Sequence, residues 1–485
     1  MIGTGRDTIY WHLGLTAGDK RGISMQPDLD FIVRTLNLPY PTFPGVNPEL
    51  SGFSIDTRTL SHGQLFAALS GPNFDGHGFI SKAVAGGAAA LLVEHDWEGT
   101  APIPILRVRG VLDALTGLAQ AWRRQVNPIV IAVTGSSGKT SVKEMITSCL
   151  KESFASVHAT RGNLNNHIGL PLTLLDMPSD CQVLVAEMGM SAAGEITHLA
   201  GVAEPDIGVV TNVHPAHLAA FANVEAIARA KGELLQALSP DHGIAIYPSQ
   251  RWETPLLKSL SRARHYMTFG ADDKADVTAH QVVLRDDGMD FDLRLPGGVG
   301  GAARLAAIAG HVLDNALAAA AAAHAAKTPL PAIIRGLDQF RLQKGRGGTV
   351  ASAGGWLVID DTYNANPGSM KAALARLGRE TTHRRLAVLG DMLELGESAE
   401  ALHEELATAV VNAGISQLFT TGCLMSRLAD RLQGHPTIEV FHRQDAGEWV
   451  GVLPGLCQPG DRILVKGSRG MKMERIVEDL CRHAV

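Results

Sequence analysis

Apolar runs alternate with helical patterns in the middle of the chain. The run IVIAV (129–133) is followed by a helical pattern over 140–152, and three further apolar runs and a helical pattern over 224–238 come after it. Strands that alternate with helices in this way predict a mostly parallel sheet built from βαβ units. Ligands of such sheets bind at the carboxyl ends of the strands, so the polar residues after each run are the candidates for a site.

Similar but shorter patterns before and after this segment predict two more α/β units. A chain of 485 residues is longer than one hydrophobic core usually organises, which also favours several domains. The predicted fold class is therefore α/β with three domains, and an alanine-rich helix over 304–326 is expected to close the central one. The predicted boundaries are an N-terminal extension at 1–27 and domains at 28–126, 127–338 and 339–485.

Composition and charge narrow the class of protein. Lysine and arginine total 43 against 49 acidic residues, a net charge of −6, and no basic block stands out, so we expect no nucleic-acid partner. The stretch 304–327 could span a bilayer, but two histidines, an aspartate and an asparagine interrupt it, so no membrane insertion is expected. Five widely separated cysteines without a CxxC pair favour a cytoplasmic protein, which we expect to be a monomer.

The segment IAVTGSSGKTSVKEM (131–145) joins a predicted strand to a predicted helix through a Gly/Ser loop. Such a loop points backbone N–H groups inward, and the helix dipole adds about half a positive charge. The first glycine comes later than in the common P-loop, yet Lys139 can reach a phosphate and Thr140 can place its hydroxyl on magnesium. A turn that only caps a helix would explain the glycines but not the Lys-Thr pair. The predicted ATP-binding loop comprises Thr134, Gly135, Ser136, Ser137, Gly138, Lys139, Thr140 and Ser141.

A carboxylate for the same cation stands at the end of the next apolar run. Glu187 ends QVLVAE, where an ionised side chain is costly unless a cation pairs with it, although a helix cap or a surface charge is the alternative. His214 and His217 follow the third run. No further ligand with zinc spacing accompanies them, so a single histidine on magnesium is the expectation.

Seven stretches, together with the loop TGSSGKTS (134–141), resemble the Mur ligase family of ATP-dependent enzymes, which build the peptide stem of bacterial peptidoglycan. They are SIDTRTLSHGQLFAALSGPNFDGHGFI (54–80), TRGNLNNHIGLPLTLL (160–175), AEMGMSAAGEI (186–196), NVHPAHLAAF (212–221), DDTYNANPGSMKAAL (360–374), LGDMLELGE (389–397) and VKGSRGMKME (465–474). The motifs are most similar to those of the members that add D-alanyl-D-alanine to UDP-N-acetylmuramoyl-tripeptide. A folylpolyglutamate synthetase-like ligase, which should lack 54–80, and a non-catalytic P-loop nucleotide-binding protein are the alternatives.

The resemblance implies a UDP-binding first domain, a P-loop ATPase as the central domain and a Rossmann-like third domain that swings over ATP. ATP would phosphorylate the terminal carboxylate of the tripeptide, and the amine of D-Ala-D-Ala would attack the acyl phosphate. The segment GRGGTVASAGG (345–355) has more glycine than a hairpin needs, and we expect it to touch no catalytic position.

The resemblance also implies roles for individual residues. The catalytic residues would be Lys139, Glu187, His217, Lys231 and Arg341. The ATP contacts outside the loop would be Asn315, Arg341 and Asp361. The Mg²⁺ ligands would be Thr140, Glu187, His217 and Lys231, the last if it is carbamylated rather than paired with Glu233 or a phosphate. The substrate contacts would be Ser54, Thr57, Arg58, Thr160, Asn165, Asn166, Tyr363, Asn364, Asn366, Lys466 and Ser468.

Overall fold

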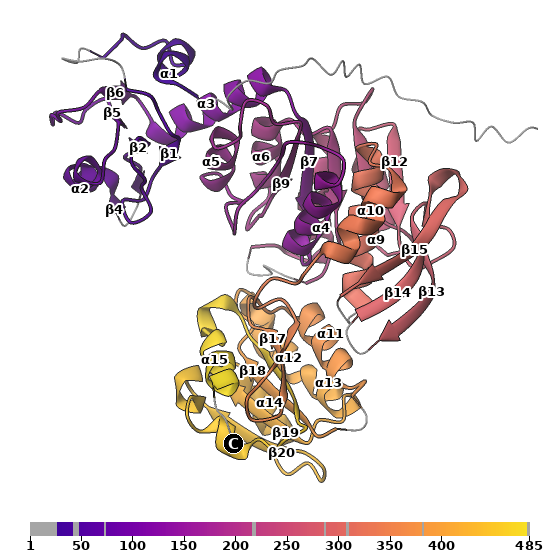
Figure 1. Ribbon diagram of the computed structural model, residues 1–485. Coiled ribbons are helices and arrows are strands. Elements are labelled where there is room, and N and C mark those ends of the chain that lie inside the picture. Colours follow the sequence, from indigo (N-terminus) through magenta and orange to yellow (C-terminus); the bar gives the residue numbers. More distant parts are fainter. Residues whose placement is uncertain are drawn as a thin grey trace, which may run out of the picture.

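The computed structural model describes residues 27–41, 48–71, 74–215, 220–285, 288–306, 310–380 and 383–482, with the backbone alone for Gly310 and His311. Nearly all of the predicted N-terminal extension lies outside these ranges. Three α/β units follow one another along the chain, at the upper left, the top and the bottom of Figure 1, so the predicted fold class is confirmed. Within the described ranges, no helix has the length and apolar character needed to cross a bilayer.

The first unit contains a four-stranded parallel sheet in the order β1-β2-β5-β6. Its strands are buried because helices cover both faces: Leu65 and Leu92 pack with α1 and α3, whereas Phe66 and Leu91 pack with α2. The elements are α1 (Leu29–Thr35), β1 (Phe53–Ser54), β2 (Leu65–Ala67), β3 (Ser70–Gly71), β4 (Phe74–Asp75), η1 (Gly76–Phe79), α2 (Ile80–Ala85), β5 (Ala90–Glu94), β6 (Ile105–Val108) and α3 (Val111–Val126).

Helix α3 fastens the first unit to the central one. It packs against α5 and α6, so one hydrophobic core runs through both units. The Trp122 indole N–H donates to the backbone oxygen of Met177 at 2.8 Å, and the buried Arg123 donates to the backbone oxygens of Ala203 and Glu204. Apolar packing and satisfied polar groups both make this junction rigid.

The central unit contains a six-stranded parallel sheet in the order β12-β11-β10-β7-β9-β8. Helices α5, α6 and α7 cover one face, and α4 and α9 cover the other (Figure 1). The strands are nearly continuous apolar runs because both faces are covered. The elements are β7 (Ile129–Thr134), α4 (Lys139–Lys151), β8 (Val157–Ala159), α5 (Gly169–Leu175), β9 (Val183–Glu187), α6 (Glu195–Ala203), β10 (Ile207–Val210), α7 (Val224–Gln236), β11 (Ile244–Pro248), α8 (Thr254–Leu260) and β12 (His265–Phe269).

An antiparallel three-stranded sheet follows in the chain, and it was not predicted from the sequence. The prediction of one helix over 304–326 is wrong at its start, because residues 304–305 end the third strand of this sheet and the helix begins at Gly310. Residues 304 and 305 run into the alanine-rich stretch with no proline or polar turn residue between them, so the helical pattern was extended too far toward the N-terminus. The elements are β13 (Thr278–Arg285), β14 (Gly288–Leu295), η2 (Pro296–Gly298), β15 (Val299–Leu305), α9 (Gly310–Ala325) and α10 (Leu330–Gln339).

The third unit contains a six-stranded sheet in the order β16-β17-β21-β18-β19-β20, in which only β16 is antiparallel to its neighbour. The strands are β16 (Gly348–Ala351), β17 (Leu357–Asp361), β18 (Arg385–Gly390), β19 (Gln417–Thr421), β20 (Glu439–Arg443) and β21 (Arg462–Lys466). The helices are α11 (Pro367–Leu377), η3 (Gly396–Ser398), α12 (Ala399–Glu404), α13 (Leu406–Asn412), α14 (Met425–Leu432), η4 (Ala446–Trp449), η5 (Leu453–Leu456), η6 (Arg469–Met471) and α15 (Glu474–Arg482).

Candidate active site

A cleft of about 850 Å³ opens between the central and third units. The central unit contributes the segments that follow β7, β8, β9, β10 and β11, together with part of α9. The third unit contributes the segment before β16, the loop between β17 and α11, and residues after β18 and at the end of β21. The carboxyl ends of parallel strands thus line the cleft from both sides, which is where α/β sheets bind ligands.

The phosphate loop depends on two glycines. Gly135 has φ +153°, and a Cβ there would lie 1.9 Å from Thr211 Oγ1. Gly138 has φ +79°, and a Cβ there would lie 2.4 Å from Asn315 Oδ1. Neither space nor backbone conformation permits a side chain at these positions. The late first glycine therefore serves the close approach of the loop to the segment after β10.

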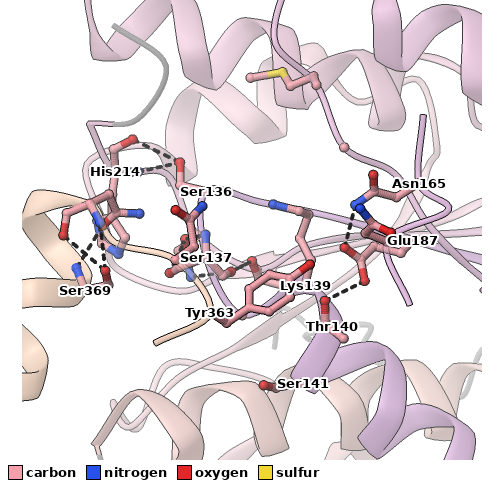
Figure 2. Close-up of a pocket in the computed structure, with 18 of the residues that line it drawn as sticks. Ser136, Ser137, Lys139, Thr140, Ser141, Asn165, Glu187, His214, Tyr363 and Ser369 are labelled. Atoms are coloured by element: carbon pink, nitrogen blue, oxygen red, sulfur yellow. Dashed lines mark hydrogen bonds between the residues drawn. The ribbon is translucent and has the colours of Figure 1, made fainter. Parts of the chain in front are cut away.

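That segment also holds the loop in place through hydrogen bonds. Ser137 N–H donates to Asn212 Oδ1 at 3.0 Å, and Asn212 Nδ2 donates back to the Ser137 oxygen at 3.1 Å. Ser136 Oγ donates to the backbone oxygen of His214 at 2.9 Å and accepts from its N–H at 3.0 Å (Figure 2). Ser141 also lines the cleft, whereas the buried Thr134 does not. Asn212 was not among the site residues predicted from the sequence, although it lies just after an apolar run.

Lys139 points into the cleft from the first turn of α4. Its Nζ donates to the backbone oxygen of Gly135 at 2.8 Å. Burial lowers the pKa of Lys139 and the charge of Arg346 lowers it further, while Glu187 opposes the shift. A phosphate in the loop would favour the charged form, since an opposite charge nearby stabilises the ammonium ion.

The predicted pair of Thr140 and Glu187 is present (Figure 2). Thr140 Oγ1 donates to Glu187 Oε2 at 2.7 Å, and Asn165 Nδ2 donates to Glu187 Oε1 at 2.8 Å. The backbone N–H of Glu187 donates to Thr160 Oγ1 at 3.0 Å, and this carboxylate is only 2% exposed. Thr160 and Asn165, predicted as substrate contacts, thus orient Glu187. Asn166 lines the cleft and its Oδ1 accepts from the backbone at the start of α5.

Lys231 lies on α7 and is 2% exposed. Burial lowers the pKa of its amine well below the ordinary value, and the nearby Lys139 lowers it further. Within the described ranges no hydrogen bond or ion pair reaches its Nζ. The alternative partner Glu233 accepts instead from Gly194 and Thr197 at the start of α6. His217 lies outside the described residues.

The third unit places an arginine on the phosphate loop, and it is not the arginine that was expected. Arg346 Nη2 donates to Thr140 Oγ1 at 2.9 Å, and its guanidinium lies 3.8 Å from the centre of the Tyr363 ring. Its buried Nε has no hydrogen-bond partner among the residues that the structure describes. Arg341 is exposed, donates to the backbone oxygen of Phe340 and does not line the cleft. The expectation that 345–355 touches no catalytic position is therefore wrong, because Arg346 belongs to that segment.

The remaining predicted residues of the third unit divide into two groups. Asp361, Tyr363, Asn364, Asn366 and Lys466 line the cleft. Lys466 is 1% exposed and its Nζ pairs with Asp361 Oδ2 at 2.7 Å. Asn366 caps α11. Ser468 is buried outside the cleft, where its Oγ accepts from Leu393 N–H at 2.9 Å, so it positions a loop of this unit.

The predicted residues of the first unit lie away from the cleft. Ser54 is buried and its Oγ donates to the backbone oxygen of Asp56. Arg58 is 80% exposed at its side chain and pairs with Asp56 at 2.6 Å, which lowers the pKa of that carboxyl to about 2. Thr57 is half-buried between them. Of these three residues, Arg58 alone is exposed.

The phosphate loop at the end of a parallel strand, the buried carboxylate on the neighbouring strand and the second α/β domain across the cleft define a multidomain P-loop nucleotide-binding protein. Comparison with known protein families narrows the class of protein further. The Mur ligase middle domain matches residues 133–323, the Mur ligase glutamate ligase domain matches 345–469, and the Mur ligase family catalytic domain matches 49–123. The chain belongs to the Mur ligase family.

Relatives in this family resemble the chain over most of its length. The UDP-N-acetylmuramoyl-tripeptide--D-alanyl-D-alanine ligase of Bacillus subtilis is 37% identical over 89% of this chain and 93% of its own. The crystal structure of MurF from Acinetobacter baumannii has a TM-score of 0.84 at 32% identity and covers 94% of this chain and 99% of its own.

Two structures with bound nucleotide are also similar. MurF from Thermotoga maritima in complex with ADP has a TM-score of 0.76 at 28% identity, over 88% of this chain and 96% of its own. A folylpolyglutamate synthase from Mycobacterium tuberculosis, complexed with ADP, has a TM-score of 0.62 over 77% of this chain and 94% of its own. At 16% identity it shows a shared fold alone.

Proposed function

We propose that the protein is an ATP-dependent ligase that joins D-alanyl-D-alanine to UDP-N-acetylmuramoyl-tripeptide through an acyl phosphate. The observation that carries the proposal is the contact of Thr140 with Glu187 at the head of the phosphate loop. It lies inside a cleft whose volume is near the upper end of the range for ligand sites, which leaves room for a peptide beside the nucleotide. The Bacillus subtilis relative matches most of the chain, and its name contains both substrates.

The proposed ligase reaction has two covalent steps. In the first, a tripeptide carboxylate oxygen forms a bond to the γ-phosphorus of ATP while the bond to ADP breaks. In the second, the amine of D-Ala-D-Ala attacks the acyl carbon and phosphate leaves. Positioning and charge neutralisation dominate phosphoryl transfer. Lys139 and the backbone N–H groups of the loop would hold the β- and γ-phosphates, and Arg346 would face them from the third unit.

The oxygen ligands at the loop fit Mg²⁺. The Thr140 hydroxyl and the Glu187 carboxylate are the ligand types that this cation prefers, and both stand beside the expected phosphates. When bound, the cation would neutralise charge on the phosphate oxygens. Asn165 and Thr160 keep Glu187 in place by binding its second oxygen and its backbone N–H.

Carbamylation of Lys231 is part of the proposal. The neutral amine is the form that adds CO₂, and burial together with Lys139 favours that form. A carbamate would give the buried face of α7 a negative charge that can face a cation, whereas an ammonium would repel one. His217, on the loop before α7, would be a further ligand.

Recognition of the UDP moiety is assigned to the first unit. Ser54, Thr57 and Arg58 flank Asp56 in the sequence, and the exposed Arg58 guanidinium is accessible enough to bind a pyrophosphate while it stays paired with Asp56. A folylpolyglutamate-type ligase would not need the segment 54–80, which here contains β2, β3, β4 and η1 and ends at the first residue of α2.

The proposal is tested by ADP release from the purified full chain. UDP-N-acetylmuramoyl-tripeptide with D-Ala-D-Ala should support release, whereas glutamate with tetrahydrofolate should not. Lys139→Ala should abolish the activity, and Lys151→Ala, which changes an exposed lysine at the end of the same helix, should leave it near wild type. Release that depends on tetrahydrofolate, or a fully active Lys139→Ala variant, would overturn the assignment.

A further inference from the structure

A buried lysine on α4 has no part in the proposed chemistry. Lys143 follows the phosphate loop by one helical turn, is 1% exposed and does not line the cleft. Its Nζ donates to the backbone oxygen of Thr160 at 2.6 Å and pairs with Glu144 Oε1 at 2.7 Å. Burial of an ammonium ion costs free energy even where it is paired, and an apolar side chain of similar length would avoid that cost. Lys143 is therefore better explained by the groups that it holds than by stability.

The group that Lys143 holds is the residue that orients Glu187. Thr160 is 1% exposed, and its hydroxyl oxygen accepts from the backbone N–H of Glu187 at 3.0 Å. The N–H of Thr160 donates to the backbone oxygen of Val185 at 3.0 Å, and its carbonyl oxygen is the acceptor for Lys143. Thr160 is thus fixed at its N–H, its carbonyl and its hydroxyl. A displacement of Lys143 would reach Glu187 through this one residue.

The same ammonium group is connected to the segment that carries Arg346. Glu144 Oε1, which pairs with Lys143, also accepts from Gln343 Nε2 at 2.8 Å. Gln343 stands three residues before Arg346, between α10 and β16. A hydrogen-bonded path therefore leads from this segment, through Glu144 and Lys143, to the carboxylate that is proposed to bind Mg²⁺.

We infer that Lys143 is a positioning residue for the Mg²⁺ site, and that its pair with Glu144 makes this site sensitive to docking of the third unit. The inference rests on the proposed function, in which Thr140 and Glu187 bind the cation. Mg²⁺ requires nearly ideal octahedral geometry, so a small displacement of one ligand weakens its binding. Groups that orient metal ligands commonly change metal affinity 10–100-fold when they are removed. Lys143 acts in this way without touching the cation or the nucleotide.

The test measures binding of the ATP analogue AMPPNP to the full chain by calorimetry, once with Mg²⁺ and once with EDTA. The quantity that decides is the ratio of the two affinities, because a general defect of the nucleotide site lowers both. Lys143→Met should reduce this ratio about tenfold, the lower end of the range, since Lys143 acts through Thr160. Lys151→Met, which removes an exposed lysine from the same helix, is the matched control and should leave the ratio unchanged.

A second variant tests the connection to the third unit. Gln343→Ala should reduce the ratio about threefold, as expected for the loss of one hydrogen bond, and should have no further effect in a Lys143→Met background. Gln339→Ala is its matched control, because Gln339 Nε2 donates in the same way to Glu152 Oε1 at 3.0 Å, at the far end of α4. This control should leave the ratio unchanged.

Each result decides the inference. An unchanged ratio in Lys143→Met, or an equal loss of affinity with Mg²⁺ and with EDTA, overturns it and leaves the ligase proposal intact. Additive effects of Lys143→Met and Gln343→Ala overturn the path to the third unit. A wild type that binds no AMPPNP overturns both the inference and the proposed function. If Lys143→Met does not fold, Gln343→Ala, which changes an exposed side chain, still carries the test, and an unchanged ratio there overturns the inference.

Discussion

Substitution of Arg346 should distinguish the arginine that the structure places at the phosphate loop from Arg341, which the sequence suggested. Arg346 donates to Thr140 Oγ1 at 2.9 Å, and its buried Nε–H has no partner within the described part of the chain, so it has a donor to spare for a phosphate oxygen. Its stacking on Tyr363 fixes the plane of the guanidinium. Arg341, by contrast, is exposed and donates to the backbone oxygens of Asp338 and Phe340.

The expected loss of activity in Arg346→Ala can be estimated from these contacts. Removal of one preorganised donor to a transition-state charge costs roughly 3–4 kcal/mol, and an arginine on a transferring phosphoryl group costs 10³-fold or more. Arg346→Ala should therefore lower kcat/KM by about 10³-fold in the ADP-release assay, whereas Arg341→Ala should change it by less than about threefold. Arg346→Lys should recover only part of the loss, because an ammonium cannot reproduce the planar fork of donors.

Stability has to be measured in parallel, because Arg346 also packs on Tyr363. That stacking contributes about 1 kcal/mol, far less than the expected loss of activity, so a folded Arg346→Ala variant should melt within a few degrees of the wild type. Arg346→Ala with near-normal kcat/KM, or an equally large loss in Arg341→Ala, would refute the reasoning and return the role to Arg341.

Three further predictions test other parts of the structure. Incubation with ¹³C-bicarbonate should give the protein a carbamate resonance that Lys231→Ala lacks; identical spectra would exclude the modification. Burial lowers the pKa of His403 below its ordinary value of 6.5, and its Nε2 accepts a backbone N–H at 2.9 Å, so the unfolded chain binds more protons below that pH. The free energy of unfolding should therefore fall as the pH drops from 7.5 to 5.5. Calorimetry should show a smaller fall for the His403→Gln variant than for the wild type, and equal falls would contradict this. Gly135→Ala should destabilise the folded chain by roughly 2–4 kcal/mol through positive φ and contact with Thr211 and should weaken AMPPNP binding. Gly117→Ala, in open space on α3, should melt at or above the wild-type temperature, and similar melting of both variants would count against the argument.

Local features of the site could be predicted from the sequence because they depend on neighbours along the chain. The strand, loop and helix around Lys139 follow from an apolar run, glycines and a Lys-Thr pair, and Glu187 follows from the cost of burying an unpaired carboxylate. Arg346 was missed because its role depends on how the third unit lies against Thr140, some 200 residues away in the sequence, which no local pattern encodes.

The position of Arg346 also couples nucleotide binding to the docking of the third unit. Thr140 donates its hydroxyl proton to Glu187 and accepts from Arg346, so a divalent cation at Thr140 would stand close to the guanidinium. A divalent cation and a guanidinium about 4 Å apart repel by about 2–8 kcal/mol at dielectric constants between those of water and a protein surface. Phosphate oxygens between them would turn this repulsion into attraction to a shared anion. The nucleotide and its cation therefore favour the docked third unit, and by linkage the docked unit favours their binding to the same degree.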